Sequence, residues 1–186
     1  MQKNQLRKPL LMQRKTLSET DKLRMDQAIG QHLLAWCTDN AAALLGVYAP
    51  MRGEPDLHPA FSQLHAQGVR LALPTVVSDD APLKFVEWIP GEAMQQDRLG
   101  VLIPAAQREE VFPHALVIPC VGFNTQHFRL GYGGGFYDRT VARVPRPATV
   151  GVAYAFSLVH FEAESFDVPM DCILTENGRF AAHEHG

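Results

Sequence analysis

The chain has 186 residues, enough for one compact domain and too few for two comfortable ones. Apolar residues make up 46% and charged residues 20%, an ordinary globular balance, and a net charge of −3 argues against binding to nucleic acid or another polyanion. No apolar run approaches the roughly 20 residues of a membrane helix, and the start of the chain has no signal-peptide core, so neither membrane insertion nor export is expected.

The first third of the chain predicts two helices followed by alternating strands and helices. A basic amphipathic helix is expected over residues 3–17, where Pro9 either kinks the helix or marks its true first turn. Ser18 followed by Asp21 resembles a capping box and opens a second helix that runs to about Trp36. The next expected elements are strands at 42–48, 69–74 and 83–88, the last of them more exposed, and a helix at 58–68.

The remaining part continues the alternation. A strongly apolar segment at 115–123 predicts a buried strand, a short helix is expected from about Phe136 to Arg143, and further strands at 148–156 and 171–177. Strands that alternate with helices predict one α/β domain with a mainly parallel sheet over residues 1–186. Residues 181–186 are expected to fray, so their two histidines are interpreted as part of a disordered end in preference to a metal site.

The three cysteines, Cys37, Cys120 and Cys172, are scattered and odd in number. Their spacing fits neither a disulfide framework nor a metal site. A reducing cytoplasm is therefore the expected location.

The segment RLGYGGGFYDR, residues 129–139, is the most distinctive stretch of the sequence. Its four glycines follow a buried strand and precede a helix, and sheets of this kind bind ligands at the carboxyl ends of their strands. Glycines let backbone N–H groups approach an anion closely, and a helix N-terminus adds partial positive charge. The pattern is neither a Walker loop nor a dinucleotide fingerprint.

The charges around this segment favour a phosphate site. Residues 129–146 contain one acid, Asp138, which among cations suits a metal ion that bridges to phosphates. The cations are Arg129, Arg139, Arg143 and Arg146. The alternative is a tight loop that needs positive φ angles, with Tyr137 packed into the core. We favour the phosphate site because the four glycines, their position between a strand and a helix, and the cluster of arginines occur together.

The N-terminal segment is also basic, because residues 1–15 contain five cations and no acid. Lys3, Arg7 and Arg14 have helical spacing on one face. Three interpretations compete: a solvated face, a mitochondrial presequence, and a phosphate-binding face. The lack of serine and the direct continuation into a structured helix weigh against the presequence.

Four motifs in order carry a resemblance to a known family. They are KNQLR near the N-terminus, YAPMRGEPD at 48–56, RLGYGGGFYDR at 129–139 and FDVPMDCILTE at 166–176. Together they resemble the 5-formyltetrahydrofolate cyclo-ligase (5,10-methenyltetrahydrofolate synthetase) family over nearly the whole chain. The resemblance implies a three-layer α/β/α sandwich with a mainly parallel sheet, a fold shared with sugar-phosphate isomerases and coenzyme A transferases. It also implies conversion of 5-formyltetrahydrofolate to 5,10-methenyltetrahydrofolate with ATP and Mg²⁺, by phosphorylation of the formyl oxygen and attack of N10.

The resemblance also implies site residues. For ATP they are Lys3, Asn4, Gln5, Leu6, Arg7, Arg14, Arg129, Leu130, Gly131, Tyr132, Gly133, Gly134, Gly135, Phe136 and Tyr137. For the folate they are Ala49, Glu54, Tyr132, Gly133, Gly134, Gly135 and Phe136. Arg129, Tyr137 and Asp138 are the implied catalytic residues, and Asp138 and Asp167 the implied Mg²⁺ ligands.

Each acid has a simpler interpretation as well. Glu54 suits the donor edge of a pterin, but by itself it is equally a solvated loop glutamate. Asp138 is alternatively a helix cap or the partner of a nearby arginine, and Asp167 a residue that stabilises the turn before Pro169.

The chain departs from the family pattern at several positions. Gly134 stands where many relatives have lysine, and Phe136 stands where tyrosine is frequent. Ser157 lies near a position where glutamine is frequent, and Phe166 stands where histidine is common. Pro9 interrupts a helix that relatives usually continue. A monomer with no nucleic-acid or membrane partner is expected. Two other functions stay open: an isomerase of the same fold, which needs no ATP, and a silent protein that binds folate and nucleotide without turnover.

Overall fold

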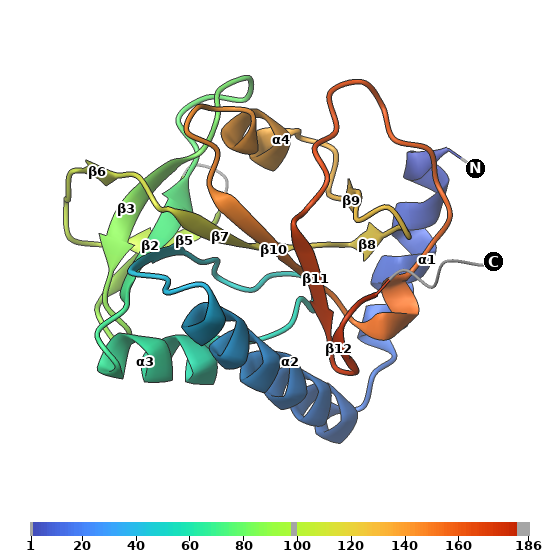
Figure 1. Cartoon of the computed structure of the whole chain (residues 1–186), viewed down its shortest axis with the longest axis horizontal. Helices are drawn as coiled ribbons and strands as arrows, with labels where there is room; N and C mark the ends of the chain where they lie inside the picture. Colours follow the sequence, from blue (N-terminus) through green and yellow to red (C-terminus); the bar gives the residue numbers. More distant parts are fainter. Residues whose placement is uncertain (1, 98–99, 182–186) are drawn as a thin grey trace.

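A central mixed sheet organises the protein, seen here in a computed structural model that describes residues 2–97 and 100–181. Within these residues the sheet has eight strands in the order β12-β11-β10-β7-β1-β2-β3-β6 (Figure 1). The parallel strands are β1 (Leu44–Gly46), β2 (Arg70–Thr75), β7 (Ala115–Pro119), β10 (Ala148–Val152) and β11 (Cys172–Thr175). Antiparallel strands complete the two margins: β3 (Lys84–Trp88), β6 (Glu110–Val111) and β12 (Gly178–Arg179). The predicted mainly parallel sheet is confirmed.

Helices lie on both faces of this sheet, as expected for an α/β/α arrangement. The long helix α2 (Glu19–Asp39) and α3 (His58–Ala66) lie below the sheet in Figure 1, and the short α4 (Phe136–Val141) lies above it. Helix α1 (Lys3–Lys15) stands to one side, next to a small sheet of β8 (Gly122–Phe123) and β9 (Arg129–Leu130). A second small sheet pairs β4 (Met94–Gln96) with β5 (Leu102–Pro104), and a 3₁₀ turn covers Ala155–Ser157. No described helix has the length and apolar character required to span a bilayer.

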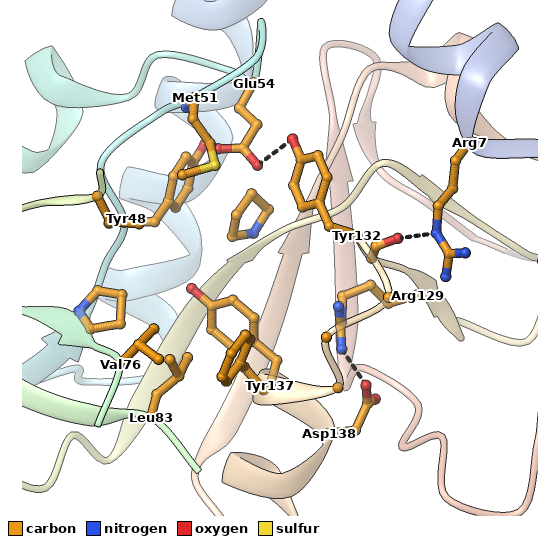
Figure 2. A pocket seen from close by; sticks show the side chains of 18 of the residues that line it. Arg7, Tyr48, Met51, Glu54, Val76, Leu83, Arg129, Tyr132, Tyr137 and Asp138 are labelled. Carbon is orange, nitrogen blue, oxygen red and sulfur yellow. Dashed lines mark hydrogen bonds and ion pairs between the residues drawn. The ribbon is translucent and has the colours of Figure 1, made fainter. Parts of the chain in front are cut away.

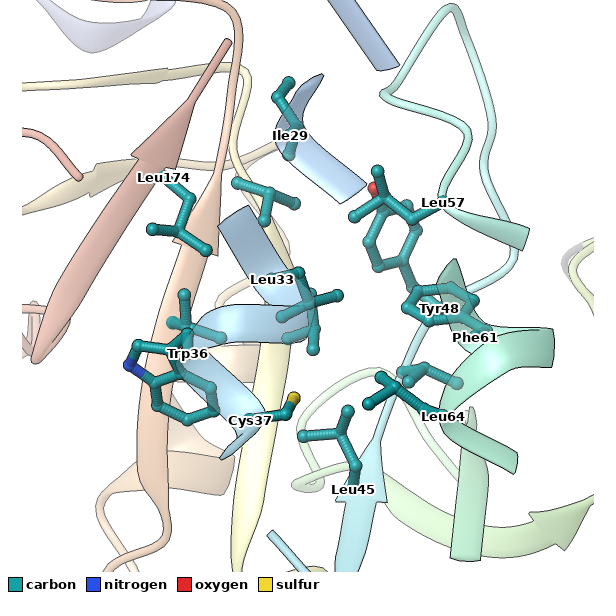
Figure 3. Packing of buried hydrophobic residues seen from close by; sticks show 14 of the residues in the cluster. Ile29, Leu33, Trp36, Cys37, Leu45, Tyr48, Leu57, Phe61, Leu64 and Leu174 are labelled. Atoms are coloured by element: carbon teal, nitrogen blue, oxygen red, sulfur yellow. The ribbon is translucent and has the colours of Figure 1, made fainter. Parts of the chain in front are cut away.

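The largest apolar cluster lies between α2 and the sheet. Ile29, Leu33 and Trp36 of α2 share this cluster with Leu45 of β1 and Leu174 of β11 (Figure 3). Side chains of α3 close the other side of this cluster. The two helices approach closely, because a Cβ atom at Gly30 would lie 3.3 Å from the Cβ of Ala60. Burial of this apolar surface holds α2 and α3 against the parallel strands.

The helix signals at the start of the chain work as expected. Ser18 caps α2 by accepting a hydrogen bond of 3.0 Å from the Asp21 N–H, and the helix continues to Asp39, three residues beyond the predicted end. Helix α1 runs through Pro9, which therefore does not mark its first turn. Pro9 is exposed, so the carbonyl that it leaves without a helical partner can meet water.

The predicted strand at 115–123 is wrong as a single element. The chain pairs with β10 only as far as Pro119, and then turns out of the sheet so that the Val121 N–H bonds to Leu130 O at 2.8 Å. Residues 122–123 join β9 in the small sheet instead. Similarly, the strand expected over 148–156 ends at Val152 and the 3₁₀ turn follows. An apolar run indicates burial but not which sheet receives it, which is why these boundaries were missed.

The short strands β4, β5, β6, β9 and β12 were not predicted, since two or three residues carry no periodic signal. The single-domain organisation over residues 1–186 stays a prediction. The expected frayed tail, with His183 and His185, lies outside the described residues except for residue 181.

Candidate active site

A cavity of about 530 Å³ opens at the carboxyl ends of neighbouring parallel strands. Tyr48 and Ala49 follow β1, Pro74 and Val76 lie at the end of β2, and Pro119 ends β7, and all five line the cavity. The glycine stretch closes one side (Figure 2). This is the edge where open parallel sheets bind their ligands, as the sequence predicted.

Glu54 enters this cavity from the loop after β1. Arg52 and Gly53 have positive φ angles of 49° and 74°, and the Glu54 N–H bonds back to Met51 O at 2.9 Å, so the chain turns sharply here. The Glu54 carboxylate accepts the Met51 N–H on Oε2 at 3.0 Å and the Tyr132 hydroxyl on Oε1 at 3.0 Å (Figure 2). The residue is 3% exposed, so it is not a solvated loop acid.

Burial outweighs the groups that stabilise the Glu54 charge. Burial raises the pKa of the Glu54 carboxyl, and the hydrogen bonds from Met51 and Tyr132 and the charges of Arg14 and Arg52 only partly oppose this effect. Burial and the Glu54 charge also raise the pKa of the Tyr132 hydroxyl, which therefore stays a donor. A buried carboxylate with two oriented acceptors suits a ligand that presents N–H donors.

The glycine stretch forms a loop whose carbonyl groups are held by arginines. Arg7 Nε donates to Gly131 O at 2.7 Å, and Arg139 Nη2 donates to Gly134 O at 2.8 Å. Gly133 and Gly135 have φ angles of 101° and 65°, conformations that side chains disfavour. The tight-loop interpretation thus holds at these two glycines, and it is compatible with a ligand-binding loop.

Arg129 and Asp138 form an ion pair of 2.6 Å on the wall of the cavity. The Arg129 guanidinium is largely buried, with the Tyr137 ring centroid 5.5 Å from its Cζ, and its Nε has no hydrogen-bond partner. Burial raises the pKa of the Tyr137 hydroxyl, which keeps it protonated. The structure therefore supports the alternative in which Asp138 pairs with an arginine, while α4 has no side-chain cap.

Asp167 lines the same cavity and pairs with Lys3. Lys3 Nζ donates to Glu164 Oε2 at 2.9 Å and also to Asp167 Oδ2. Burial lowers the pKa of Lys3, but its hydrogen bonds to the two carboxylates outweigh this, so the net shift is upward. Asp167 Oδ2 further accepts the Glu164 N–H at 2.7 Å, which stabilises the turn before Pro169.

The structure brings most of the predicted site residues into this one cavity. Those that line it are Lys3, Arg7, Ala49, Glu54, Arg129, Gly131, Tyr132, Gly133, Gly134, Gly135, Phe136, Tyr137, Asp138 and Asp167. A neighbouring cavity of about 640 Å³ shares Lys3, Arg7 and Gly133 and is also lined by Asn4. The two cavities adjoin where Lys3, Arg7, Gly133 and Glu164 line both of them.

Four predicted residues lie elsewhere. Leu6 and Leu130 pack in an apolar cluster with Leu10, and Gln5 is exposed. Arg14 is 2% exposed and donates to Cys120 O, while two of its nitrogens have no hydrogen-bond partner. Its charge acts on Glu54 and Tyr132, so the structure places Arg14 beneath the site and not on its surface.

Sequence reasoning missed three contributors. Arg52 lies over the Tyr132 ring at 5.2 Å, Glu164 shares Lys3 with Asp167, and Leu83 lines the apolar side of the cavity. Glu164 lies three residues before Asp167, and Arg52 lies two residues before Glu54 within the motif YAPMRGEPD, so both had a signal in the sequence. The place of Leu83 follows from tertiary packing.

Two of the family departures are neighbours in space. A Cβ atom at Gly134 would lie 2.8 Å from Cε2 of Phe136, so a lysine at this position requires the Phe136 ring to move. The Arg139 guanidinium covers the same ring, with Cζ 5.1 Å from its centroid. Gly134, Phe136 and Arg139 are thus a matched set in this chain.

The carboxylates fit a magnesium ion only with help from a ligand. Among the residues that the structure describes, no group of three or more histidine, cysteine or acidic side chains could hold a metal ion by itself. Asp138 and Asp167 line the same cavity, and Mg²⁺ commonly takes one or two carboxylates together with phosphate oxygens and water. The residues present therefore fit a nucleotide-bound ion.

The fold and the cavity place a glycine loop and several arginine and lysine side chains at the carboxyl edge of a parallel sheet, an arrangement typical of α/β enzymes. The chain belongs to the 5-formyltetrahydrofolate cyclo-ligase family, whose model matches residues 1–176. The predicted family, the fold class and the assignment to an enzyme of this family are confirmed.

Relatives and solved structures agree with this membership. A 5-formyltetrahydrofolate cyclo-ligase of Mycoplasma pneumoniae is 31% identical, and the match covers 95% of this chain and 99% of the relative. A 5-formyltetrahydrofolate cyclo-ligase of Escherichia coli K12 is 29% identical, and the match covers 87% of this chain and 93% of the relative. The solved 5,10-methenyltetrahydrofolate synthetase of Mycoplasma pneumoniae has a TM-score of 0.80 at 30% identity, covering 95% of this chain and 99% of its own. The solved 5,10-methenyltetrahydrofolate synthetase of Aquifex aeolicus has a TM-score of 0.82 at 28% identity, and the match covers 100% of this chain and 95% of that structure.

Proposed function

We propose that the protein converts 5-formyltetrahydrofolate to 5,10-methenyltetrahydrofolate and consumes ATP, with ADP and phosphate as the other products. The observation that carries this proposal is the single cavity that Glu54, the glycine loop, Arg129 and Lys3 line together. It offers an acceptor for a pterin on one side and cations for phosphates on the other.

The reaction needs activation because a formamide oxygen is a poor leaving group. In the proposed first step, the formyl oxygen attacks the γ-phosphorus of ATP, the bond to the β–γ bridging oxygen breaks, and ADP leaves. In the second step, the N10 lone pair attacks the formyl carbon and closes the ring. The carbon–oxygen bond then breaks, phosphate leaves, and the N10 proton is released to solvent. No covalent bond to the protein is required.

The protein's part is to orient two ligands and to compensate developing charge. Glu54 would hold the pterin through its two carboxylate oxygens. Arg129, Arg7 and Lys3, with the backbone of residues 131–135, would hold the phosphates, and the protonated Tyr137 would donate a hydrogen bond in the cavity.

Asp138 and Asp167 are the proposed ligands of Mg²⁺. The ion would supply positive charge to the phosphate oxygens during transfer. Because both carboxylates are paired with cations, Arg129 and Lys3 must share or release them for the metal.

We further infer a monomer that works in the cytoplasm without nucleic-acid or membrane partners. The three cysteines are free and buried, and burial raises the pKa of Cys37 and Cys120 to about 12. Unpaired cysteines of this kind are typical of a reducing compartment.

The test is an assay of the purified protein with 5-formyltetrahydrofolate and Mg²⁺, with and without ATP, followed by the methenyl chromophore. The expected result is product formation that requires ATP and matches ADP and phosphate release. Equal product without nucleotide, or AMP and pyrophosphate as products, overturns the proposal. Binding of both ligands without turnover would identify the silent binder instead.

A further inference from the structure

Lys22 contacts the Glu54 loop from behind the candidate active site. It lies near the start of α2, and its Nζ donates to the Glu54 backbone carbonyl at 3.1 Å. Lys22 does not face the large cavity but a separate crevice of about 300 Å³ between α2 and α3. Its side chain is 30% exposed, so it reaches the loop from a partly solvated position.

A buried carboxylate holds Lys22 in this place, and a buried tyrosine holds that carboxylate. Asp26, one helical turn later, accepts from Lys22 Nζ through Oδ2 and from the Tyr154 hydroxyl through Oδ1 at 2.7 Å. The Asp26 side chain is 6% exposed and Tyr154 is fully buried just after β10. A chain of polar contacts therefore connects the sheet, α2 and the backbone of Glu54.

The Glu54 carbonyl belongs to the turn that carries the carboxylate into the cavity. The turn at residues 51–54 is closed by the Glu54 N–H and by the carboxylate itself, which are contacts within the turn. Three contacts attach the turn to the rest of the protein: Lys22, the Tyr48 hydroxyl, which donates to Pro55 O at 2.6 Å, and the Tyr132 hydroxyl, which donates to the carboxylate at 3.0 Å. Because a shift of about 1 Å can cost about 100-fold in a reaction, this attachment matters for a bidentate contact.

We propose that Lys22 is a positioning residue for the folate side of the reaction, acting through the backbone of Glu54. The inference rests on the proposed function, since it takes the Glu54 carboxylate to be the group that binds the folate. Lys22 itself touches neither ligand. Its loss should therefore weaken folate binding and leave the nucleotide side unchanged.

The test variant is Lys22→Met, which keeps the length of the side chain and removes the charge and the donors. We expect the KM for 5-formyltetrahydrofolate to rise at least fivefold, with kcat and the KM for ATP within twofold of wild type. Hydrogen exchange in residues 49–57 should become faster, a readout that does not depend on turnover. Arg24→Met is the matched control, because Arg24 is exposed on the same helix and contacts Asp21.

Lys22→Met leaves the buried Asp26 carboxylate without its cation, so the single variant can fold poorly. The double variant Lys22→Met/Asp26→Asn restores neutrality and is then the one assayed, with the same expected result. An unchanged folate KM in the folded variant overturns the inference, and so does an equal rise of both KM values.

Glu54→Gln in the same assay separates the two proposals. If it raises the folate KM and Lys22→Met does not, only the inference about Lys22 fails. If Glu54→Gln has no effect, the assignment of Glu54 to the folate fails and the inference about Lys22 fails with it. If wild-type protein forms no product with ATP, the proposed function itself is at fault.

Discussion

The hydroxyl of Tyr132 donates a hydrogen bond of 3.0 Å to Oε1 of Glu54, and so joins two loops that are 78 residues apart in the sequence. One loop follows β1 and the other is the glycine stretch, which the proposed function assigns to the folate and the nucleotide, respectively. The contact makes the ionisation of Glu54 depend on the position of the glycine loop, because the hydrogen bond lowers the Glu54 pKa against the effect of burial.

Replacing Tyr132 by phenylalanine tests this coupling. Tyr132→Phe removes the donor, so the Glu54 pKa should rise. The carboxylate then becomes protonated at a higher pH than in wild-type protein. The acid limb of the pH profile of kcat/KM for the folate, which reports the free enzyme, should therefore move to higher pH. A limb that stays in place would show that Glu54 does not govern folate capture.

Replacing Glu54 by glutamine should weaken folate binding while ATP affinity is kept. The loss of a charged hydrogen bond costs about 1.5–3 kcal/mol in a desolvated site, or about 10- to 100-fold in Kd. Calorimetry with each ligand measures both affinities. Unaltered folate affinity in Glu54→Gln would contradict the assignment.

The same variant should not lose stability at neutral pH. The folded-state pKa of Glu54 is raised above the ordinary value of 4.5, so between these two pKa values the folded state binds more protons than the unfolded state. The free energy of unfolding of wild-type protein therefore falls as pH rises through this window, and this contribution is absent in Glu54→Gln. Urea unfolding of both proteins at pH 4.5 and pH 8 checks the sign: the difference in favour of the variant should be larger at pH 8.

Charge removal on α1 should act on ATP. Lys3→Ala and Arg7→Ala should each raise the KM for ATP more than the KM for the folate. The loss in binding free energy should be about 1.5–3 kcal/mol for each charged hydrogen bond removed. Lys8→Ala is the control, since Lys8 is exposed on the same helix and lines neither cavity. Equal changes in the KM for ATP in all three variants would show that this helix face is only solvated and does not bind phosphate. Arg14 is left out because it is buried, and its loss would be expected to destabilise the protein.

The metal assignment predicts a changed Mg²⁺ requirement. Asp138→Asn and Asp167→Asn should fold, lose most turnover and need more Mg²⁺ for the remainder. The competing role is structural, because Asp138 compensates the buried Arg129, and breaking a buried pair costs about 3–5 kcal/mol. Thermal unfolding beside Mg²⁺ titrations of activity distinguishes the two. Stability lost in proportion to activity, at an unchanged Mg²⁺ requirement, would make these acids structural.

Much of the local architecture could be predicted from the sequence. The Ser18 cap, the alternation of strands and helices and the glycine stretch between a buried strand and a helix depend on contacts within a few residues. The residues that make such contacts are close together in the sequence, so the local sequence pattern predicts them. The four ordered motifs also indicated the family, which the family model over residues 1–176 confirms.

Tertiary structure decided which of these residues meet. Nothing near Glu54 in the sequence predicts that Tyr132 would bond to its carboxylate and Lys22 to its carbonyl, or that Arg14 would be buried while Arg7 holds the glycine loop. These contacts depend on how α1 and α2 pack against the sheet, and that packing follows from apolar burial over the whole chain. The sequence alone therefore determined the longer elements and the chemistry available, and the packing of distant elements determined the short strands and the geometry of the site.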